Sequence, residues 1–244
     1  MTALMESQKR RLGGDKDVVS SDGGDTYSVY EVGSKLTDNP VNDDGLVGYW
    51  KLDEGSGNFA DSSGNGNAGT EAGTLSRGQT GKVNKAVGFG TNNYITIADS
   101  SSLDITGNLT MSAWVKPVDY TNYRGIFQEY ANTDYVYQSY GMFTDQSGIK
   151  IIVEGTQLNP SAIPALNEWH HVVGTYDGSN VRLYIDGSLS SSTSKTGSVT
   201  SHATDSYIGR FTGRLDFNGS LDDIRIYNRA FSAAEVQALY NANK

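Results

Sequence analysis

Residues 169–187 read WHHVVGTYDGSNVRLYIDG, and this stretch decides the fold class. Two runs rich in β-branched and aromatic residues, at 169–176 and 181–185, flank the polar residues 177–180. Such runs, separated by a short loop that contains Asp-Gly, are typical of an antiparallel β-hairpin. A second Asp-Gly pair at 186–187 opens the next turn. The stretch therefore predicts consecutive strands that are joined by tight turns.

The same pattern continues through residues 46–228, where short apolar runs alternate with turns about every ten residues. In one run the odd-numbered apolar residues from Leu109 to Val115 share one face, and Trp114 takes the other. The 244 residues include 29 Gly, 15 Tyr and only 4 Pro, which suits many tight turns between strands. These patterns predict an all-β fold, a two-sheet antiparallel sandwich over residues 46–228.

One short helix is predicted near the end of the chain, over residues 232–241. Ser232 and Glu235 have the spacing of a capping box, in which each residue satisfies a backbone N–H of the other. Val236, Leu239 and Tyr240 follow at helical spacing and form an apolar stripe. We expect the helix to pack this stripe onto the sandwich.

Charge and cysteine content exclude several classes of function. The chain has 19 basic and 28 acidic residues, for a net charge of -9, and no basic run. Nucleic acid is therefore not an expected partner, because phosphate neutralisation requires positive charge. The absence of cysteine excludes disulfides, thiol catalysis and Cys-ligated metals. No apolar run approaches the length of a membrane span, so none is predicted in this chain.

Residues 1–44 differ from the rest of the chain. They contain neither Trp nor Phe and carry several turn signals built on Gly, Asp, Asn and Pro. We interpret them as a partly ordered N-terminal appendage with little core of its own. The domain boundary is placed after Asp44, before the apolar-aromatic stretch that begins at Leu46, so that residues 45–244 form the sandwich domain.

Six strings occur in order along the chain: GLVGYWKLDEGSG at 45–57, DSSGNGNAG at 61–69, LTMSAWV at 109–115, EWHHVV at 168–173, LYIDG at 183–187 and GSLDDIRIYNRA at 219–230. Together they resemble a laminin-G-like domain of the concanavalin A-like lectin/glucanase jelly-roll group, over about residues 46–241. The resemblance implies two stacked, curved antiparallel sheets. It also implies a binding role, because members of the group serve mainly as sugar-, protein- or surface-binding modules.

The N-terminal segment has a second resemblance. The strings at 3–9, 22–24 and 30–36 are similar to the part that follows the hydrophobic helix of bacterial type IV pilin-like or pseudopilin proteins. This resemblance implies a truncated portion of a subunit that assembles into a pilus or another surface structure. A disordered leader is the alternative interpretation.

No catalytic residue is predicted. A glycoside hydrolase on such a sandwich needs two carboxyl groups that project into one cleft. The spacing Glu-x-Asp-x-x-Glu of the related endoglycanases does not occur in the chain. Asp222 and Asp223 are adjacent, so strand alternation directs them to opposite faces. We therefore expect that the chain is not an enzyme.

The loop 61–67 is a candidate calcium site. Asp61, Asn65 and Asn67 alternate with Gly and Ser, and oxygen ligands on a flexible loop suit a hard cation. Asp222 is the predicted distant ligand that completes the shell. The alternative is a loop whose side chains satisfy their own backbone, with Asp222 as a hydrogen-bonded structural residue.

Tyrosines are concentrated at residues 120–140 and suggest a ligand-binding surface. Aromatic rings stack on the apolar face of a sugar ring, while amides bind its hydroxyl groups. The alternative is that these tyrosines pack within a sheet. The predicted ligand-binding residues, of which at least two tyrosines are expected to present a ring to solvent, are Tyr123, Tyr130, Tyr135, Tyr140, Asn132 and Gln138.

These observations favour a non-catalytic recognition module on the cell surface or outside the cell. The expected partner is a glycan or a surface protein, and carbohydrate binding or adhesion is the expected activity. Two alternatives remain. One is a structural pilin-like subunit that displays the sandwich, and the other is a divergent glycoside hydrolase.

Overall fold

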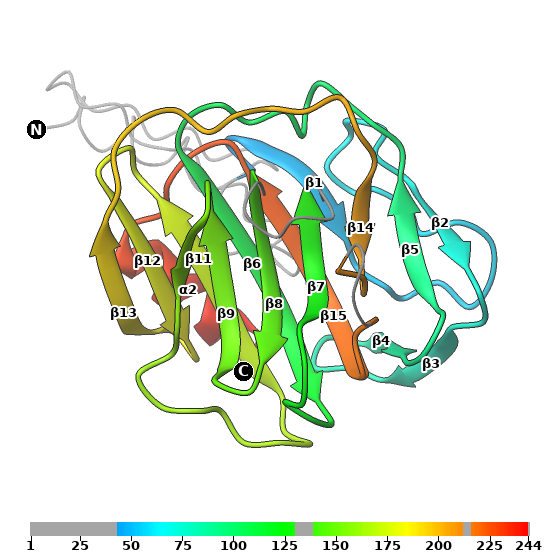
Figure 1. Ribbon diagram of the computed structural model, residues 1–244. Coiled ribbons are helices and arrows are strands. Elements are labelled where there is room, and N and C mark those ends of the chain that lie inside the picture. Colours follow the sequence, from blue (N-terminus) through cyan, green and yellow to red (C-terminus); the bar gives the residue numbers. More distant parts are fainter. Residues whose placement is uncertain (1–42, 130–138, 212–215, 244) are drawn as a thin grey trace, which may run out of the picture. The chain divides into compact units, whose positions relative to one another are not determined.

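The computed structural model describes residues 43–129, 139–211 and 216–243. The predicted appendage, apart from Asp43 and Asp44, and its pilin-like strings lie outside the described residues. Two antiparallel sheets pack face to face, and the helix α2 (Ala233–Ala242) lies outside them (Figure 1). This arrangement confirms the predicted all-β, two-sheet antiparallel sandwich with a short C-terminal helix.

The first sheet contains, in spatial order, β13 (Ser188–Ser194), β12 (Asn180–Ile185), β11 (His170–Tyr176), β6 (Leu109–Pro117), β15 (Gly219–Tyr227), β4 (Lys85–Phe89) and β3 (Ser76–Thr80), and β1 (Leu46–Trp50) also pairs with β15. The second sheet contains β10 (Thr156–Leu158), β9 (Gly148–Val153), β8 (Tyr140–Asp145), β7 (Arg124–Glu129), β14 (Ser206–Ile208), β5 (Tyr94–Ile97) and β2 (Gly69–Ala72). The hairpin predicted from residues 169–187 is the β11–β12 pair.

The main core lies between the two sheets and follows the predicted alternation. The odd-numbered residues of β6 from Leu109 to Val115 face this core, whereas Trp114 stacks on Tyr240 of the helix at 5.8 Å between ring centroids. Trp50 is fully buried in the core and stacks on Phe127 at 5.8 Å. One face of β6 therefore serves the sandwich interior and the other serves the helix.

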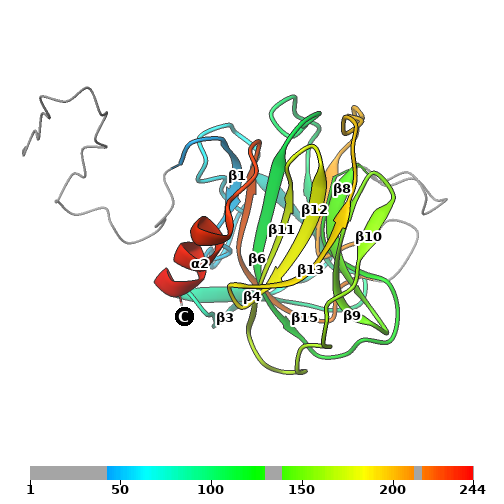
Figure 2. The same cartoon turned by 90° about the vertical axis from the view of Figure 1, so that its left-hand side faces the viewer.

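The helix α2 covers the outer face of the first sheet (Figure 2). Ser232 and Glu235 form the predicted capping box, with the Ser232 N–H donating to Glu235 Oε2 at 2.8 Å. Val236 and Leu239 are buried in a second apolar cluster with Tyr49, Val173, Tyr184, Tyr227, Phe231 and Leu46. Among the described residues, no helix has the length and apolar character that a membrane span requires.

Three neighbouring strands bring distant segments together at one end of the sandwich. Leu46, at the start of β1, pairs with Tyr227 at the end of β15. Tyr227 in turn pairs with Thr110, near the start of β6. The residues just before β6, just after β15 and at the start of β1 are therefore neighbours, although 181 positions separate 47 from 228. The candidate site lies at this end.

Candidate functional site

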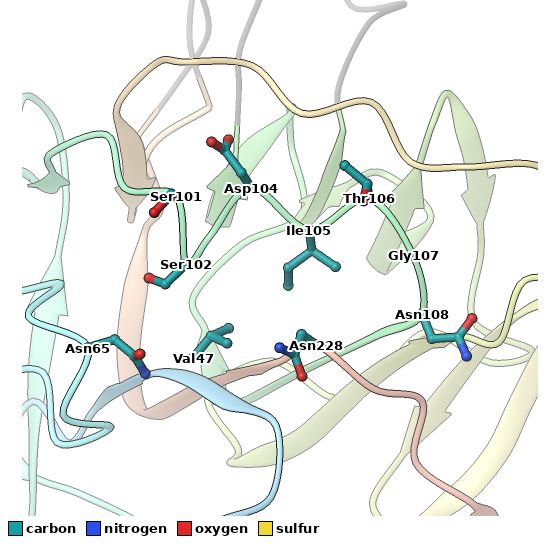
Figure 3. A pocket seen from close by; sticks show the side chains of 10 residues that line it. All are labelled: Val47, Asn65, Ser101, Ser102, Asp104, Ile105, Thr106, Gly107, Asn108 and Asn228. Carbon is teal, nitrogen blue, oxygen red and sulfur yellow. The ribbon is translucent and has the colours of Figure 1, made fainter.

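A pocket of about 450 Å³ is hollowed into the end of the sandwich where β1, β6 and β15 meet (Figure 3). Its volume falls within the range of about 300–1,000 Å³ that is typical of small-molecule sites. The pocket is lined by Val47, Asn65, Ser101, Ser102, Asp104, Ile105, Thr106, Gly107, Asn108 and Asn228.

The lining combines an apolar centre with polar surroundings. Val47 and Ile105 point toward each other across the pocket in Figure 3, and each is 6% exposed. Ser101, Asn108 and Asn228 are exposed around them. No other described residue forms a side-chain hydrogen bond with these three, so their amide and hydroxyl groups are available to a ligand as donors and acceptors. Such a lining matches a ligand that carries both apolar C–H surface and many hydroxyl groups.

Asn67 fixes the loops that form the pocket. Its side chain is 3% exposed, and its Nδ2 donates to the carbonyl oxygen of Val47 at 2.7 Å and to Ser102 Oγ at 2.8 Å. Ser102 Oγ is also within 3.0 Å of Ser100 Oγ. The loops around residues 61–67 and 100–105 are thus tied to each other and to β1. This bonding holds the pocket in shape before a ligand arrives, which reduces the entropy cost of binding.

Asp61 organises the 61–67 loop from within. Its Oδ1 accepts hydrogen bonds from the backbone N–H groups of Tyr49 at 3.0 Å and Ser63 at 2.9 Å. Its Oδ2 accepts from Ser63 Oγ at 2.8 Å and from the Asn67 N–H at 2.9 Å. A cation at this carboxylate would have to displace these donors, so the residues present do not form a ready-made calcium site. Asn65, by contrast, does line the pocket.

Asp222 binds a different part of the chain. It is fully buried, and its Oδ2 accepts from the N–H groups of Lys82 and Val83, both at 2.8 Å. Asp222 therefore holds the loop between β3 and β4, whereas Asp61 holds the loop after β1. The described residues contain no group of three or more His, Cys, Asp or Glu side chains placed to hold a metal ion. Calcium binding stays a prediction.

Asp104 is the charged member of the pocket lining. Figure 3 shows its carboxylate at the rim, on the same side as Ser101 and directed away from Ile105. Partial burial and the nearby charge of Asp99 raise the pKa of Asp104, and His202 opposes that effect. No described residue donates a hydrogen bond to this carboxylate or forms an ion pair with it. Asp104 thus brings unpaired negative charge to the pocket.

A buried carboxyl group lies near enough to the pocket residue Asp104 to interact with its charge. Glu129, the last residue of β7, is 2% exposed, and its Oε2 has no hydrogen-bond partner among the described residues. Burial raises the pKa of Glu129 to about 8, and a hydrogen bond to Ser139 only partly offsets that effect. Glu129 is therefore mostly protonated and uncharged at neutral pH.

The structure corrects one of the predicted tyrosines. Tyr140 was one of the four tyrosines of which at least two were expected to present a ring to solvent, but it is fully buried, stacks on Phe127 at 6.0 Å and donates its hydroxyl to the Leu103 carbonyl oxygen at 2.7 Å. Tyr123 is half-buried and stacks on Phe143 at 5.5 Å. The other predicted ligand-binding residues lie outside the described residues: Tyr130, Tyr135, Asn132 and Gln138.

A smaller pocket of about 220 Å³ contains a His–Asp pair that the sequence analysis did not single out. His170 Nδ1 lies 2.9 Å from Asp186 Oδ2, as in hydrolytic triads. Its Nε2, however, lies 3.1 Å from the Ala165 carbonyl oxygen, where a triad would place a nucleophile. Both ring nitrogens therefore face acceptors, and the hydrogen bond to Asp186 raises the pKa of His170. The pair fastens the loop before β11.

The sequence analysis found only part of the first pocket. Asn65 was singled out as a metal ligand, and it does line the pocket. Ser101, Asp104, Asn108 and Asn228 were missed, because only the pairing of β1, β15 and β6 brings them together. The available signal was the polar run at 99–102, which precedes the turn Gly107-Asn108 and the long strand β6.

The fold resembles domains of several solved structures. Domain 4 of AbnA, an extracellular GH43 arabinanase from Geobacillus stearothermophilus in complex with arabinotriose, has a TM-score of 0.64 and 22% identity, with 80% of this chain and 98% of that chain covered. The binding domain of Paraclostridial Mosquitocidal Protein 1 has a TM-score of 0.63 and 18% identity, with 82% of this chain and 52% of that chain covered.

A third structure, of Trypanosoma rangeli sialidase, has a TM-score of 0.61 and 15% identity, with 80% of this chain and 33% of that chain covered. The chain thus spans about half of the mosquitocidal binding domain and a third of the sialidase. No curated protein matches the chain in sequence. The laminin-G-type family model described as the concanavalin A-like lectin/glucanases superfamily matches residues 89–237, which is more than half of the chain. The chain therefore belongs to the concanavalin A-like lectin/glucanase superfamily.

Proposed function

We propose that this chain is a non-catalytic carbohydrate-binding module and that the pocket at the end of β1, β6 and β15 is its binding site. The observation that carries the proposal is the lining itself. Val47 and Ile105, each 6% exposed, form a small apolar floor for the C–H face of a sugar ring. Ser101, Asn108 and Asn228 offer hydroxyl and amide groups that no other described side chain engages.

The similar structures support this class of ligand. Domain 4 of AbnA was solved with arabinotriose, and the structure of botulinum neurotoxin type C, with a TM-score of 0.64 and 12% identity over 83% of this chain and 52% of that chain, concerns two ganglioside molecules. Both ligands are carbohydrates or carry them. AbnA is also described as extracellular, in keeping with our proposal that this module acts outside the cell or on its surface.

Asn108→Ala tests the proposed site. Asn108 precedes β6 and its side chain is exposed, so the substitution removes a ligand contact without creating a cavity. Loss of one neutral hydrogen bond corresponds to about 0.5–1.5 kcal/mol, or roughly a threefold to tenfold weaker affinity. Screening on a glycan array identifies a ligand, and isothermal titration of that ligand measures the change. Affinity itself is expected between the micromolar and millimolar ranges, because sugars must shed water from many hydroxyl groups.

Asn122→Ala is the matched control. Asn122 is another exposed amide, but it lies beyond the opposite end of β6, roughly 25 Å from Asn108 at about 3.3 Å per strand residue. It should leave affinity unchanged. If Asn108→Ala binds as tightly as wild type, or if both variants lose affinity equally, the pocket is not the site. Release of reducing sugar from the bound glycan would instead favour the divergent hydrolase.

A further inference from the structure

We propose that the pocket selects uncharged glycans over glycans that carry a carboxylate, and that Asp104 imposes this selection. The inference rests on the proposed function, because it assigns a substrate class to the same pocket. Two observations carry it. One is the charge of the groups around the pocket, and the other is the set of partners that the nearby Arg229 already has.

Among the described residues, the pocket lining contains no cationic side chain. Of the ten described lining residues, Asp104 alone carries a formal charge, and the others are neutral amide, hydroxyl, apolar or glycine residues. Protein sites that bind sialic or uronic acids need a donor for the carboxylate, most often Arg or Lys. A bound carboxylate in this pocket would lose water without gaining such a partner.

Arg229, the cationic residue that follows the pocket residue Asn228, has partners outside the pocket. Arg229 places its Nη1 2.5 Å from Glu235 Oε1 and donates its Nε–H to the Asp44 carbonyl oxygen at 2.8 Å. The pair with Glu235 ties the start of α2 to the end of β15. Arg229 therefore already faces the carboxylate of Glu235, which offsets its positive charge before any ligand anion could do so.

Negative charge is instead concentrated beside the pocket. Asp104 is partly buried, and its environment, including Asp99, already raises its pKa. A second anion placed in the pocket would meet the same repulsion, because effective dielectric constants near protein surfaces are well below that of water. Among the described residues, His202 is the group whose charge opposes the rise in the pKa of Asp104. The net charge of -9 adds a long-range contribution of the same sign.

A neutral sugar meets none of these penalties. Its hydroxyl groups can donate to the Asp104 carboxylate, which has no donor among the described residues, and such charge-assisted hydrogen bonds are stronger than neutral ones. Asp104 therefore favours hydroxyl donors at the rim and disfavours carboxylates. The same residue produces both effects, which makes it a specificity determinant.

The test uses a glycan array on which neutral oligosaccharides are printed beside their sialylated or uronic-acid counterparts, followed by titration of the best pair at low salt. The full chain should bind the acidic member about tenfold more weakly, and the difference should shrink at about 1 M NaCl, where charges are screened within about 3 Å. Asp104→Asn should bind the acidic glycan more tightly, so that the affinity difference between the neutral and the acidic glycan falls to about threefold or less.

Glu168→Gln is the matched control, because it removes one exposed carboxylate just before β11, near the opposite end of β6, and should leave the difference intact. Preferred or equal binding of the acidic glycans overturns the inference and leaves the proposed function standing. If no glycan of either kind binds, the proposed function itself fails. If Asp104→Asn does not fold, the salt dependence of the wild-type chain decides. A preference for neutral glycans that does not change with salt concentration overturns the inference.

Discussion

Glu129 keeps a proton at neutral pH because it is buried at the end of β7, and this should make stability depend on pH. Its pKa is about 8 in the folded chain, against 4.5 for an ordinary Glu, so the folded state binds more protons between those values. Stability therefore falls as pH rises from about 4.5 to about 8. In Glu129→Gln the amide does not ionise, and the decline in unfolding free energy over this range should be smaller.

Urea unfolding between pH 6.5 and 9 measures this effect as the difference between wild type and Glu129→Gln, because His170, whose raised pKa gives a decline of the same sign, contributes to both. Asp222 also has a pKa of about 8, through burial, and contributes a decline of the same sign. The pKa of His171 is lowered to about 3 by burial, so its contribution increases with pH only up to about 6.5. Glu168→Gln removes an exposed carboxylate and is the control. An identical pH slope in wild type and Glu129→Gln would contradict the assignment.

At the scale of single residues, the sequence indicates which hydrogen bonds a side chain can form better than it indicates whether that side chain is buried. For the 61–67 loop, the hydrogen bonds that Asp61 accepts from the backbone of Ser63 and Asn67 agree with the alternative to a calcium site, a loop whose side chains satisfy its own backbone. Tyr140 was included among the candidate ligand-binding tyrosines because Tyr is amphipathic, yet every residue of β8 is buried. A strand that is buried on both faces shows no alternation of apolar and polar residues from which exposure could be predicted. Whether its second face is covered depends on segments that are distant in the sequence.

At the scale of elements, α2 illustrates what local sequence does specify. Its capping box and its apolar stripe are encoded within nine residues, Ser232 to Tyr240, so both were predictable. The pocket was not predictable in this way. Its lining comes from four separate segments, and no motif within any one segment announces that β1, β15 and β6 will be neighbours.

Docking of α2 should contribute measurably to stability. Leu239 is 1% exposed within the cluster beneath the helix, so Leu239→Ala removes buried methyl groups and leaves a cavity. The expected loss of unfolding free energy is about 2–4 kcal/mol. For a chain of this size, each kcal/mol lowers Tm by about 2–4 °C. Gln237→Ala changes a half-exposed residue of the same helix and should leave Tm nearly unaltered. Equal melting temperatures for both variants would mean that the helix is not docked in solution.

At the scale of the whole molecule, stability and the exposed polar lining of the pocket depend on different parts of the sandwich. The main core lies between the sheets and includes the pocket residues Val47 and Ile105, and the second apolar cluster lies under α2. The exposed lining residues lie in loops at the strand ends, outside both clusters. Substitutions of exposed pocket residues such as Asn108 should therefore affect affinity while leaving the unfolding transition unchanged.

The domain boundary predicted near residue 45 can be tested by measuring the stability of a shortened chain. Both sheets, α2 and the apolar clusters are built from residues between Leu46 and Ala242. A chain that begins at Asp43 should therefore fold by itself, with the Tm and the urea m-value of the full chain, because m scales with the surface exposed on unfolding. Calorimetry and urea titration of the two chains make the comparison, and a chain begun at Trp50, which lacks most of β1, is the control that should be destabilised. A clear drop in Tm or in m for the chain that begins at Asp43 would show that residues 1–42 belong to the folded unit, and the boundary would then have to be moved toward the N-terminus.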